Sequence, residues 1–364
     1  MTLCQRKKWR PVEPLYAGSG DMKGHLRVLR AGRGETIQDG GRHGFLRYGV
    51  PTAGPMDWVA HSTANCALGN EPGAAAIEVS ISGIDLMCEI APLRIAYAGG
   101  DFVWTYNGKR VPHAAILRLN PGDYVSVKAG SWGTWAYVAV PGGLDMPPVL
   151  GSRSTNLTSQ FGGLDGRSLA LGDVLCPTAP TSPGTWSGLE TLIAAPWLDR
   201  CTKRIRLILG PQDDYFEPSS IEALFHESFL LGPRFDRMAY WLNGPTLKHS
   251  SKGADIVSDG IALGAIQVPG SGQAVVLMAD RQSTGGYPKI ATVIRADLGR
   301  VAQTRPGEEL RFERSDPVQA RGVLLALHRN FDRIADYVSA AGSTDSEYLF
   351  GCNLIDGVVG TARY

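Results

Sequence analysis

Glycine and proline interrupt this chain so often that few segments are long enough to form an extended helix. The sequence contains 45 glycines and 23 prolines, and short runs of β-branched and aromatic residues fill many of the intervals between them. Such punctuation favours strands joined by turns, as in barrels and sandwiches, over helix bundles. We therefore expect a mainly β fold with a few short helices.

Eight segments concentrate apolar residues in the way that buried strands do. They are Ala76–Ile81, Leu93–Ala98, Ala115–Leu119, Tyr124–Val127, Trp135–Val140, Ile205–Leu209, Ala274–Met278 and Ala291–Ile294. Two Asn-Gly pairs, Asn107-Gly108 and Asn243-Gly244, lie between strand-like runs. Because this dipeptide readily takes the positive φ values of tight turns, we predict a hairpin at each pair.

Three helices are predicted. The first follows the capping residue Asp57 and ends near Gly69, and the second follows a cap at Ser219 or Ser220. The third lies near the end of the chain, where apolar residues recur at spacings of three and four and form one face. Its members are Val323, Leu327, Phe331, Ile334 and Val338. We expect this face to pack against the rest of the protein.

The chain is long enough for two domains. With 364 residues and 43% hydrophobic content, it can bury two sizeable cores. The stretch 178–188 is rich in Pro, Thr and Ser, breaks the strand pattern and is the best linker candidate. We predict a loose tail at residues 1–22, a first domain at 23–180, a linker at 181–200, a second domain at 201–320, and a C-terminal helix and tail at 321–364.

Charge and composition exclude several kinds of partner. The 36 basic and 35 acidic residues give a net charge of +1, which supplies no electrostatic footprint for nucleic acid or an anionic membrane. No segment has the length and hydropathy of a membrane span, and the basic N-terminus lacks the apolar run of a signal peptide. The six cysteines are scattered, without metal-ligand spacing. We expect a cytoplasmic protein with reduced thiols and no metal.

The polar segment Asp280–Lys289 follows an apolar strand and is the strongest candidate site. A loop of this kind lies at a barrel rim, where Gly285 and Gly286 would let successive N–H groups converge on an anion. Lys289 adds a positive charge, and Tyr287 adds a hydroxyl and a stacking face. Such a site suits a carboxylate, a phosphate or a developing oxyanion. A solvated tight turn is the competing interpretation.

A second cluster contains Asp57, with Gln38 and Arg42 upstream. An ionised carboxylate only accepts hydrogen bonds, so Asp57 suits the N–H of an amide or a urea-like group. The helix cap described above explains the same residue equally well. Both roles can coexist.

A third cluster contains Ser152, Arg153 and Ser154, followed by tandem glycines. It suits an oxyanion, although the same residue types also build rigid Ω-loops, which is the interpretation we favour. A serine nucleophile would need a histidine as its base. The candidates in the first half are His43, His61 and His113.

These segments resemble, in order, the motifs of the allophanate hydrolase subunit 2 or KipI antagonist family. That family includes the C subunit of the bacterial 5-oxoprolinase and part of the carboxyltransferase region of urea carboxylase. Ordered motifs in this number are far more specific than any single pattern. The matching stretches, all between residues 26 and 318, are 36–42, 49–57, 64–65, 69–70, 151–167, 210–214, 236–238, 264–269 and 280–289.

The resemblance implies two cyclophilin-like β-barrel domains and partnership with a separate KipI-like subunit. It implies either ATP-dependent opening of 5-oxoproline or a related cyclic amide, together with a lactam-hydrolysing A subunit, or carboxyl transfer from carboxybiotin to a urea-like acceptor. The second activity needs separate biotin carboxylase and carrier proteins, because the chain has no biotinyl-lysine segment. Fold does not choose between these chemistries. The free-standing form favours the 5-oxoprolinase-like role.

No cofactor is expected to be bound covalently. ATP would act within the complex, and it would not be held by a Walker loop of this chain, because the chain contains no G-x-x-x-x-G-K-[ST] motif. Biotin belongs to the alternative activity. A third hypothesis is a non-catalytic binder that antagonises a KipI-like kinase inhibitor through an apolar interface.

On this resemblance we assign roles to individual residues. Lys289 and the glycine amides would stabilise the group in transit, Tyr287 would position the biotin ring or substrate, and the two aspartates would orient the amide nitrogen. The catalytic candidates are Lys289, Tyr287, Asp280 and Asp57. The substrate-binding candidates are Gln282, Thr284, Gly285, Gly286, Arg237, Gln38 and Arg153.

Three positions depart from the family pattern. Trp241 stands where an arginine is usual, Asn156 where an aspartate is usual, and Ser283 where a threonine is common. Losing an arginine removes a fork that grips a carboxylate at two points. If that arginine binds substrate in relatives, Trp241 predicts a less anionic or more planar substrate. A structural surface replacement is the alternative.

Overall fold

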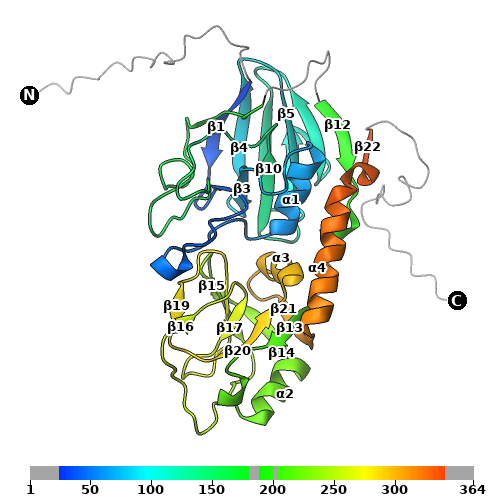
Figure 1. Ribbon diagram of the computed structural model, residues 1–364. Coiled ribbons are helices and arrows are strands. Elements are labelled where there is room, and N and C mark those ends of the chain that lie inside the picture. The colour runs from blue at the N-terminus through cyan, green and yellow to red at the C-terminus, as the bar shows by residue number, and fades with distance from the viewer. Residues whose placement is uncertain (1–23, 180–187, 200–203, 341–364) are drawn as a thin grey trace, which may run out of the picture.

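The computed structural model describes residues 24–179, 188–199 and 204–340, and this part of the chain is mainly β (Figure 1). The predicted tail at 1–22, residues 181–187 and 200 of the predicted linker, and the predicted tail beyond 340 lie outside these ranges. All eight predicted strands are present, with bounds that shift by one or two residues at most. The predicted fold class is confirmed.

The first half of the chain (residues 24–199), joined by the late strand β22, forms two antiparallel sheets that face each other across one core. The first has the order β11-β1-β4-β9-β6-β7, with bounds Val174–Leu175, His25–Ala31, Ile84–Glu89, Tyr124–Lys128, Val103–Tyr106 and Lys109–Val111. The second has the order β2-β3-β10-β5-β8-β12-β22, with bounds Thr36–Gln38, Ala76–Ser80, Trp135–Ala139, Leu93–Gly99, Ala115–Leu119, Gly188–Ile193 and Val338–Ala340.

Alternation along the strands decides what each face of the second sheet buries. In β10, Ala136 and Val138 point into the core between the two sheets, whereas Trp135 and Tyr137 belong to the cluster on the opposite face. That opposite face packs against α1 and continues into the core of the second half. The two halves therefore share one apolar cluster.

The second half (residues 204–314) is a closed seven-stranded barrel. Its order is β13-β20-β17-β18-β15-β14-β21, with bounds Arg204–Leu209, Lys289–Val293, Ala265–Gln267, Val275–Leu277, Ala239–Asn243, Ser228–Phe235 and Glu309–Arg314. A parallel pairing of β13 with β21 closes it. A small hairpin-like pair, β16 (Asp259–Gly260) with β19 (Thr284–Gly285), stands beside the barrel.

The described part of the chain has few helices, and α4 is the longest of them. The α-helices are α1 (Trp58–Ala67), α2 (Pro218–His226), α3 (Leu298–Ala302) and α4 (Pro317–Asp332), and the 3-10 helices are η1 (Leu46–Tyr48), η2 (Pro196–Leu198), η3 (Asp213–Tyr215), η4 (Arg295–Asp297) and η5 (Ile334–Tyr337). The predicted start of α1 is confirmed, because the Asp57 carboxylate accepts hydrogen bonds from the N–H groups of Val59 and Ala60.

Two helix boundaries differ from prediction. The N-cap of α2 is Glu217 rather than Ser219 or Ser220, because Pro218 occupies the first turn, where a residue without an N–H fits well. Helix α4 ends at Asp332, so two residues of the predicted apolar face lie beyond it. They fall in η5 and in β22, where the chain pairs with β12 instead of continuing as a helix.

The two Asn-Gly pairs behave differently. Asn107 and Gly108 have φ values of 47° and 78° and join β6 to β7, which confirms the first hairpin. The second prediction is wrong, since neither Asn243 nor Gly244 is among the residues of positive φ. Gly244 is required for another reason: a Cβ there would lie 2.6 Å from the Phe229 ring.

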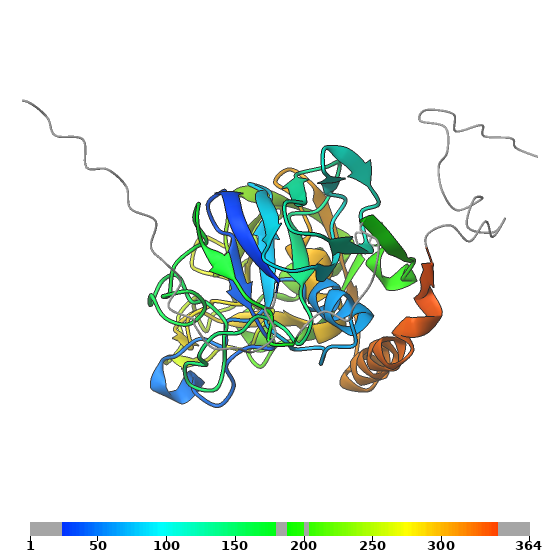
Figure 2. The same cartoon turned by 90° about the horizontal axis from the view of Figure 1, so that it is seen from above.

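The end of the described chain returns from the barrel to the first half. Helix α4 runs alongside both halves in Figure 1 and lies on the side of α1 in Figure 2. Its Phe331 ring packs edge-on against Trp58 of α1, with ring centroids 5.7 Å apart. Strand β12, which falls within the predicted linker, then pairs with β22. The two halves are thus joined by elements that are distant in sequence.

Candidate functional site

A buried arginine, Arg237, binds acidic residues from both halves. It lies in the turn between β14 and β15 and is 7% exposed. Its Nε and Nη2 atoms donate to the Asp280 carboxylate at 2.8 and 3.0 Å, and Nη1 donates to the Glu78 carboxylate of β3. Nη2 also donates to the carbonyl of Gly54 at 2.8 Å. The guanidinium therefore ties the barrel to the first half.

Glu78 gathers hydrogen bonds from three directions. Besides Arg237, the N–H of Met56 and the hydroxyl of Tyr137 each donate to its Oε2 atom at 2.8 Å. Burial raises the pKa of Glu78, and the charge of Arg237 opposes that rise. Although burial disfavours its charged form, the carboxylates of Asp280 and Glu78 raise the pKa of Arg237. Because all three groups donate hydrogen bonds to the Glu78 side chain, we describe that side chain as an ionised carboxylate.

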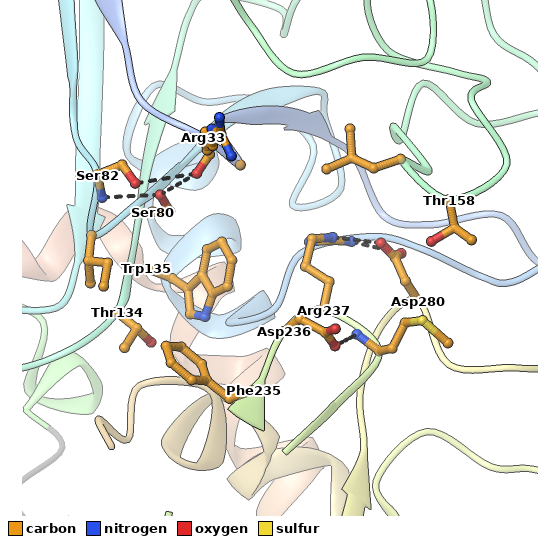
Figure 3. A pocket seen from close by; sticks show the side chains of 14 residues that line it. Arg33, Ser80, Ser82, Thr134, Trp135, Thr158, Phe235, Asp236, Arg237 and Asp280 are labelled. Carbon is orange, nitrogen blue, oxygen red and sulfur yellow. Dashed lines mark hydrogen bonds and ion pairs between the residues drawn. The ribbon is translucent and has the colours of Figure 1, made fainter. Parts of the chain in front are cut away.

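A hollow of about 350 Å³ opens between the halves beside this network, and we call it the inter-half hollow. Figure 3 shows Trp135 and Phe235 on one side of it and the paired Arg237 and Asp280 on the other. Arg33 lines it from the first half. The walls are thus aromatic, and the buried ion pair forms part of the lining.

A smaller hollow of about 210 Å³, the outer slot, lies on the outside of the barrel. The polar and aromatic residues used below that line it are Arg234, Trp241, Gln267, Gln282 and Tyr287. It shares Asp236 and Met238 with the inter-half hollow. The two hollows therefore lie on either side of the same β14–β15 turn. Of the residues predicted from the sequence, Arg237 and Asp280 line the inter-half hollow. Gln282 and Tyr287 line the outer slot.

Lys289 lines neither hollow. It is 3% exposed and begins β20, and its Nζ atom donates to Asp259 of β16 at 2.8 Å. Its backbone N–H donates to Gln212 at 3.2 Å. The ammonium thus fixes the β16–β19 pair against the barrel and is not brought together with Asp57.

The tandem glycines do not form the predicted anion cradle. Thr284 and Gly285 form β19 and pair with β16, and neither Gly285 nor Gly286 has the positive φ that a nest of successive N–H groups uses. Gly285 serves close packing, because a Cβ there would lie 2.7 Å from Nε2 of Gln267. The segment Asp280–Lys289 therefore packs over the outer slot.

Asp57 and Gln38 are buried away from both hollows. Besides capping α1, the Asp57 carboxylate accepts from Nε2 of Gln303 at 3.0 Å. The Gln38 side chain donates to the carbonyl of Thr155 at 3.1 Å and accepts from the N–H of Gly54 at 3.1 Å. Both side chains hold loops of the first half in place.

The cluster around Arg153 is structural in its geometry. The hydroxyls of Ser152 and Ser154 donate to one oxygen of Asp39 at 2.6 and 2.7 Å. In the described residues neither hydroxyl bonds a histidine, so the arrangement of a serine hydrolase is not formed. Arg153 donates through Nε to the carbonyl of Met146 at 2.8 Å and lines a third hollow, of about 570 Å³, within the first half.

The positions that depart from the family pattern lie in different surroundings. Trp241 lines the outer slot, and the guanidinium of Arg234 lies 4.2 Å from its ring centroid. Asn156 is fully buried, and its Nδ2 atom has no partner among the described residues. Ser283 accepts a backbone hydrogen bond from Ile261 at 3.0 Å. Of the three, only Trp241 lines one of the hollows described above.

Sequence reasoning missed Glu78, Tyr137, Asp259 and Arg234. A signal for Glu78 was present, since it is the one charged residue in the otherwise apolar and small run Ala76–Ser80. A charge in the middle of a buried strand requires a partner. The partners come from elements distant in sequence, and no local pattern identifies them.

Within the described ranges, no three His, Cys, Asp or Glu side chains gather closely enough to bind a metal ion. In the same part of the chain, no helix combines the length and the apolar character that crossing a bilayer requires.

Comparison with known proteins gives concordant findings. The model of the carboxyltransferase domain, subdomain A and B, matches residues 48–314. The chain is 34% identical over 319 residues to the C subunit of the 5-oxoprolinase of Escherichia coli (strain K12), an alignment that covers 85% of this chain and 97% of that protein. It is 33% identical over 307 residues to the urea amidolyase of Lachancea kluyveri, an alignment that covers 78% of this chain and 16% of that protein.

The fold agrees with the sequence matches. The crystal structure of the Kluyveromyces lactis urea carboxylase superposes with a TM-score of 0.79 at 29% identity, covering 88% of this chain and 31% of that one. The chain thus spans nearly all of one kind of relative and a minor part of the other.

Proposed function

The chain belongs to the family of the carboxyltransferase domain, subdomain A and B, and on that premise we propose that it is a cytoplasmic subunit of a 5-oxoprolinase-like complex. In this proposal it acts with two partners, one KipI-like and one lactam-hydrolysing, on 5-oxoproline or a related cyclic amide. It contributes substrate-contacting residues to a reaction that the whole assembly carries out.

The observation that carries the proposal is the extent of the match. The alignment to the C subunit of 5-oxoprolinase covers 97% of that protein, whereas the alignment to the urea amidolyase covers 16% of that one. A chain that corresponds to a whole subunit is expected to work as one. The alternative function comes from the urea amidolyase, in which the matched region is a minor part of a longer protein.

The proposed reaction opens the ring at its amide bond. A water oxygen bonds to the ring carbonyl carbon, the C–N bond breaks, the nitrogen takes up a proton, and ATP is hydrolysed to ADP and phosphate. The chain contains no Walker loop, so we assign ATP binding to the assembly rather than to this chain alone. The residues that we assign to substrate contact are those of the outer slot, and Arg237 with Asp280 hold the adjoining turn.

The remaining candidates receive supporting roles in this proposal. Lys289 keeps the β16–β19 pair in place, and Asp57 keeps α1 and Gln303 in place. Both side chains are buried and bonded to protein groups, and each acts through its neighbours.

The test is reconstitution with purified partners. The full chain is combined with a KipI-like protein and a lactam-hydrolysing protein, and glutamate and ADP are measured after addition of 5-oxoproline and ATP. We expect the two products in equal amounts, and only when all three proteins are present. Glutamate formation that is unchanged when this chain is omitted would reject the proposal.

Carboxyl transfer is the second candidate, and the structural match to the urea carboxylase favours it. It predicts that labelled bicarbonate is incorporated into urea when the chain is supplied with biotin carboxylase and a biotinylated carrier protein. Incorporation in that assay, together with no glutamate in the first assay, would select this alternative. A chain that binds the KipI-like protein but supports neither reaction would be the non-catalytic antagonist.

A further inference from the structure

The outer slot begins with an apolar surface on the outside of the barrel. Because side chains alternate along a strand, Tyr240 and Val276 fill the barrel core while their neighbours point outward. The outward residues form a separate apolar cluster that includes Val275 and Leu277, and both are less than 5% exposed. Trp241 packs at the edge of this cluster. These apolar residues on the outer face of the barrel are therefore covered by another part of the protein.

The register places a row of three side chains across this face. Trp241 pairs with Val275, and Val275 pairs with Gln267 on the next strand. Cross-strand partners on one face lie side by side, so the indole and the amide flank the same valine. This row is the floor of the slot.

The roof comes from the segment that follows Asp280. Nε2 of Gln267 donates to the carbonyl of Tyr287 at 3.2 Å. Gly285 has no side chain, which leaves room for the Gln267 amide beside it. Tyr287 is 43% exposed and Gln282 is also exposed, so both remain accessible to a ligand while the backbone beneath Tyr287 is fixed. Gln282 offers one amide carbonyl and one amide NH₂ group.

Arg234 supplies the positive charge of the slot. Its guanidinium lies 4.2 Å from the Trp241 ring centroid, and in the described residues it has no carboxylate partner. A stacked guanidinium keeps its edge donors free for an anion. The other charged residue of the slot, Asp236, accepts from the N–H groups of Met238 and Ala239 through Oδ1.

We propose that the outer slot binds a small planar cyclic amide that carries a carboxylate, an inference that rests on the proposed function and names the site of its substrate. The ring lies on Trp241, its carboxylate meets the edge of Arg234, and its amide N–H and carbonyl pair with the amide of Gln282. In the inter-half hollow, by contrast, the guanidinium of Arg237 is already engaged by Asp280 and Glu78. Arg33 is the other arginine of that hollow and is exposed, whereas the arginine of the outer slot is stacked on the ring that forms the floor.

Calorimetric titration of the full chain tests this assignment. The probes are 5-oxoproline and 2-pyrrolidinone, which has the same ring without the carboxylate. We expect 5-oxoproline to bind at least about tenfold more tightly, the ratio that one charge-assisted hydrogen bond provides. Arg234→Gln should remove this preference and leave the affinity for 2-pyrrolidinone unchanged. Trp241→Ala should weaken both ligands at least about tenfold, whereas Trp241→Phe retains an aromatic floor and most of the affinity.

The matched control is Arg33→Gln, which removes an exposed arginine from the inter-half hollow. Unchanged binding in this variant supports the outer slot. The assignment is overturned if Arg33→Gln weakens 5-oxoproline binding and Arg234→Gln does not, if the two probes bind equally, or if neither saturates at roughly 10 mM. Arg234 is exposed, so its replacement does not threaten the fold.

The reconstituted reaction separates failure of this inference from failure of the proposed function. Normal ring opening by Arg234→Gln and by Trp241→Phe and Trp241→Ala would retain the function and reject the slot. Ring binding at the slot with no ATP-dependent opening by the assembly would retain the slot and reject the function.

Discussion

His61 lies within α1 with its imidazole fully buried, and burial lowers its pKa. The Nε2 atom lies 3.1 Å from the carbonyl of Gln38. In the unfolded chain a histidine has a pKa of about 6.5. As the pH falls below that value the unfolded chain takes up a proton that the folded protein resists, so stability present above about pH 6.5 is lost on acidification.

We therefore predict that His61→Gln weakens the acid dependence of stability. Between about pH 6.5 and pH 5, the wild-type protein should lose up to about 1.4 kcal/mol more per pH unit than the variant does. The measurement is the free energy of unfolding in urea at several pH values. Because other groups titrate in both proteins, the informative quantity is the difference between the two slopes, and parallel curves would contradict the prediction.

At the residue scale, sequence patterns identified several important side chains but not the groups to which those side chains are hydrogen-bonded. Asp57 was predicted as a cap because the capping rule is local. Arg237 and Asp280 were both selected from ordered motifs, but nothing local indicates that they bind each other. Lys289 was expected to face a ligand, and its partner Asp259 comes from a separate strand, β16. Partner identity depends on tertiary placement, which spacing does not encode.

The β16–β19 pair is held to the barrel by one ion pair of unequal burial. The Lys289 side chain is 4% exposed, whereas that of Asp259 is 55% exposed. Removing the acid leaves a buried ammonium unpaired, whereas removing the ammonium leaves a carboxylate that water solvates. The cost of breaking the pair should therefore depend on which partner is changed.

We predict that Asp259→Asn destabilises the protein by about 1–3 kcal/mol and that Lys289→Met costs less than about 1 kcal/mol. The double variant should recover most of the loss caused by Asp259→Asn, because no buried charge remains. Urea unfolding of the three variants checks this order. If Lys289→Met proves the more damaging single change, the ammonium has a role beyond this pair.

At the element scale, local rules held where neighbouring strands pair with each other. Asn107-Gly108 joins β6 to β7, which are partners in one sheet, so the turn rule applies. Asn243 is the last residue of β15, whose partners are β14 and β18, and the chain leaves the barrel at Gly244 without forming a hairpin. The same dipeptide thus has two outcomes, and the difference lies in strand order, which the sequence pattern does not reveal.

At the scale of the whole molecule, Arg237 joins the barrel to the first half through Glu78 and Gly54. Arg237→Ala leaves the buried carboxylates of Glu78 and Asp280 without their common cation. We predict a loss of about 3–5 kcal/mol in the free energy of unfolding, the cost of breaking a buried ion pair from one side. Unfolding in urea, followed by tryptophan fluorescence, measures it.

Arg234→Gln is the matched control for this prediction, since Arg234 lies three residues earlier and is exposed. Its effect on stability should stay within about 0.5 kcal/mol. Equal effects of the two substitutions would show that the Arg237 network contributes nothing to the union of the halves.

The mainly β character followed from glycine and proline usage, and the order of motifs indicated the family. The division into a first domain, a linker and a second domain remains a proposal, and β12 lies inside the predicted linker. Connections such as β12 with β22, and the shared apolar cluster, involve residues far apart in the chain. Their formation depends on the packing of whole sheets, which no window of sequence contains.

The pairing of β22 with β12 has a consequence for synthesis on the ribosome. Residues 188–193 leave the exit tunnel long before residues 338–340 are translated. During that time the edge of β12 that later pairs with β22 is unpaired. An exposed edge is a template for pairing with other chains. Until residues 338–340 become available, the outer edge of β12 is therefore open to mispairing in the nascent protein.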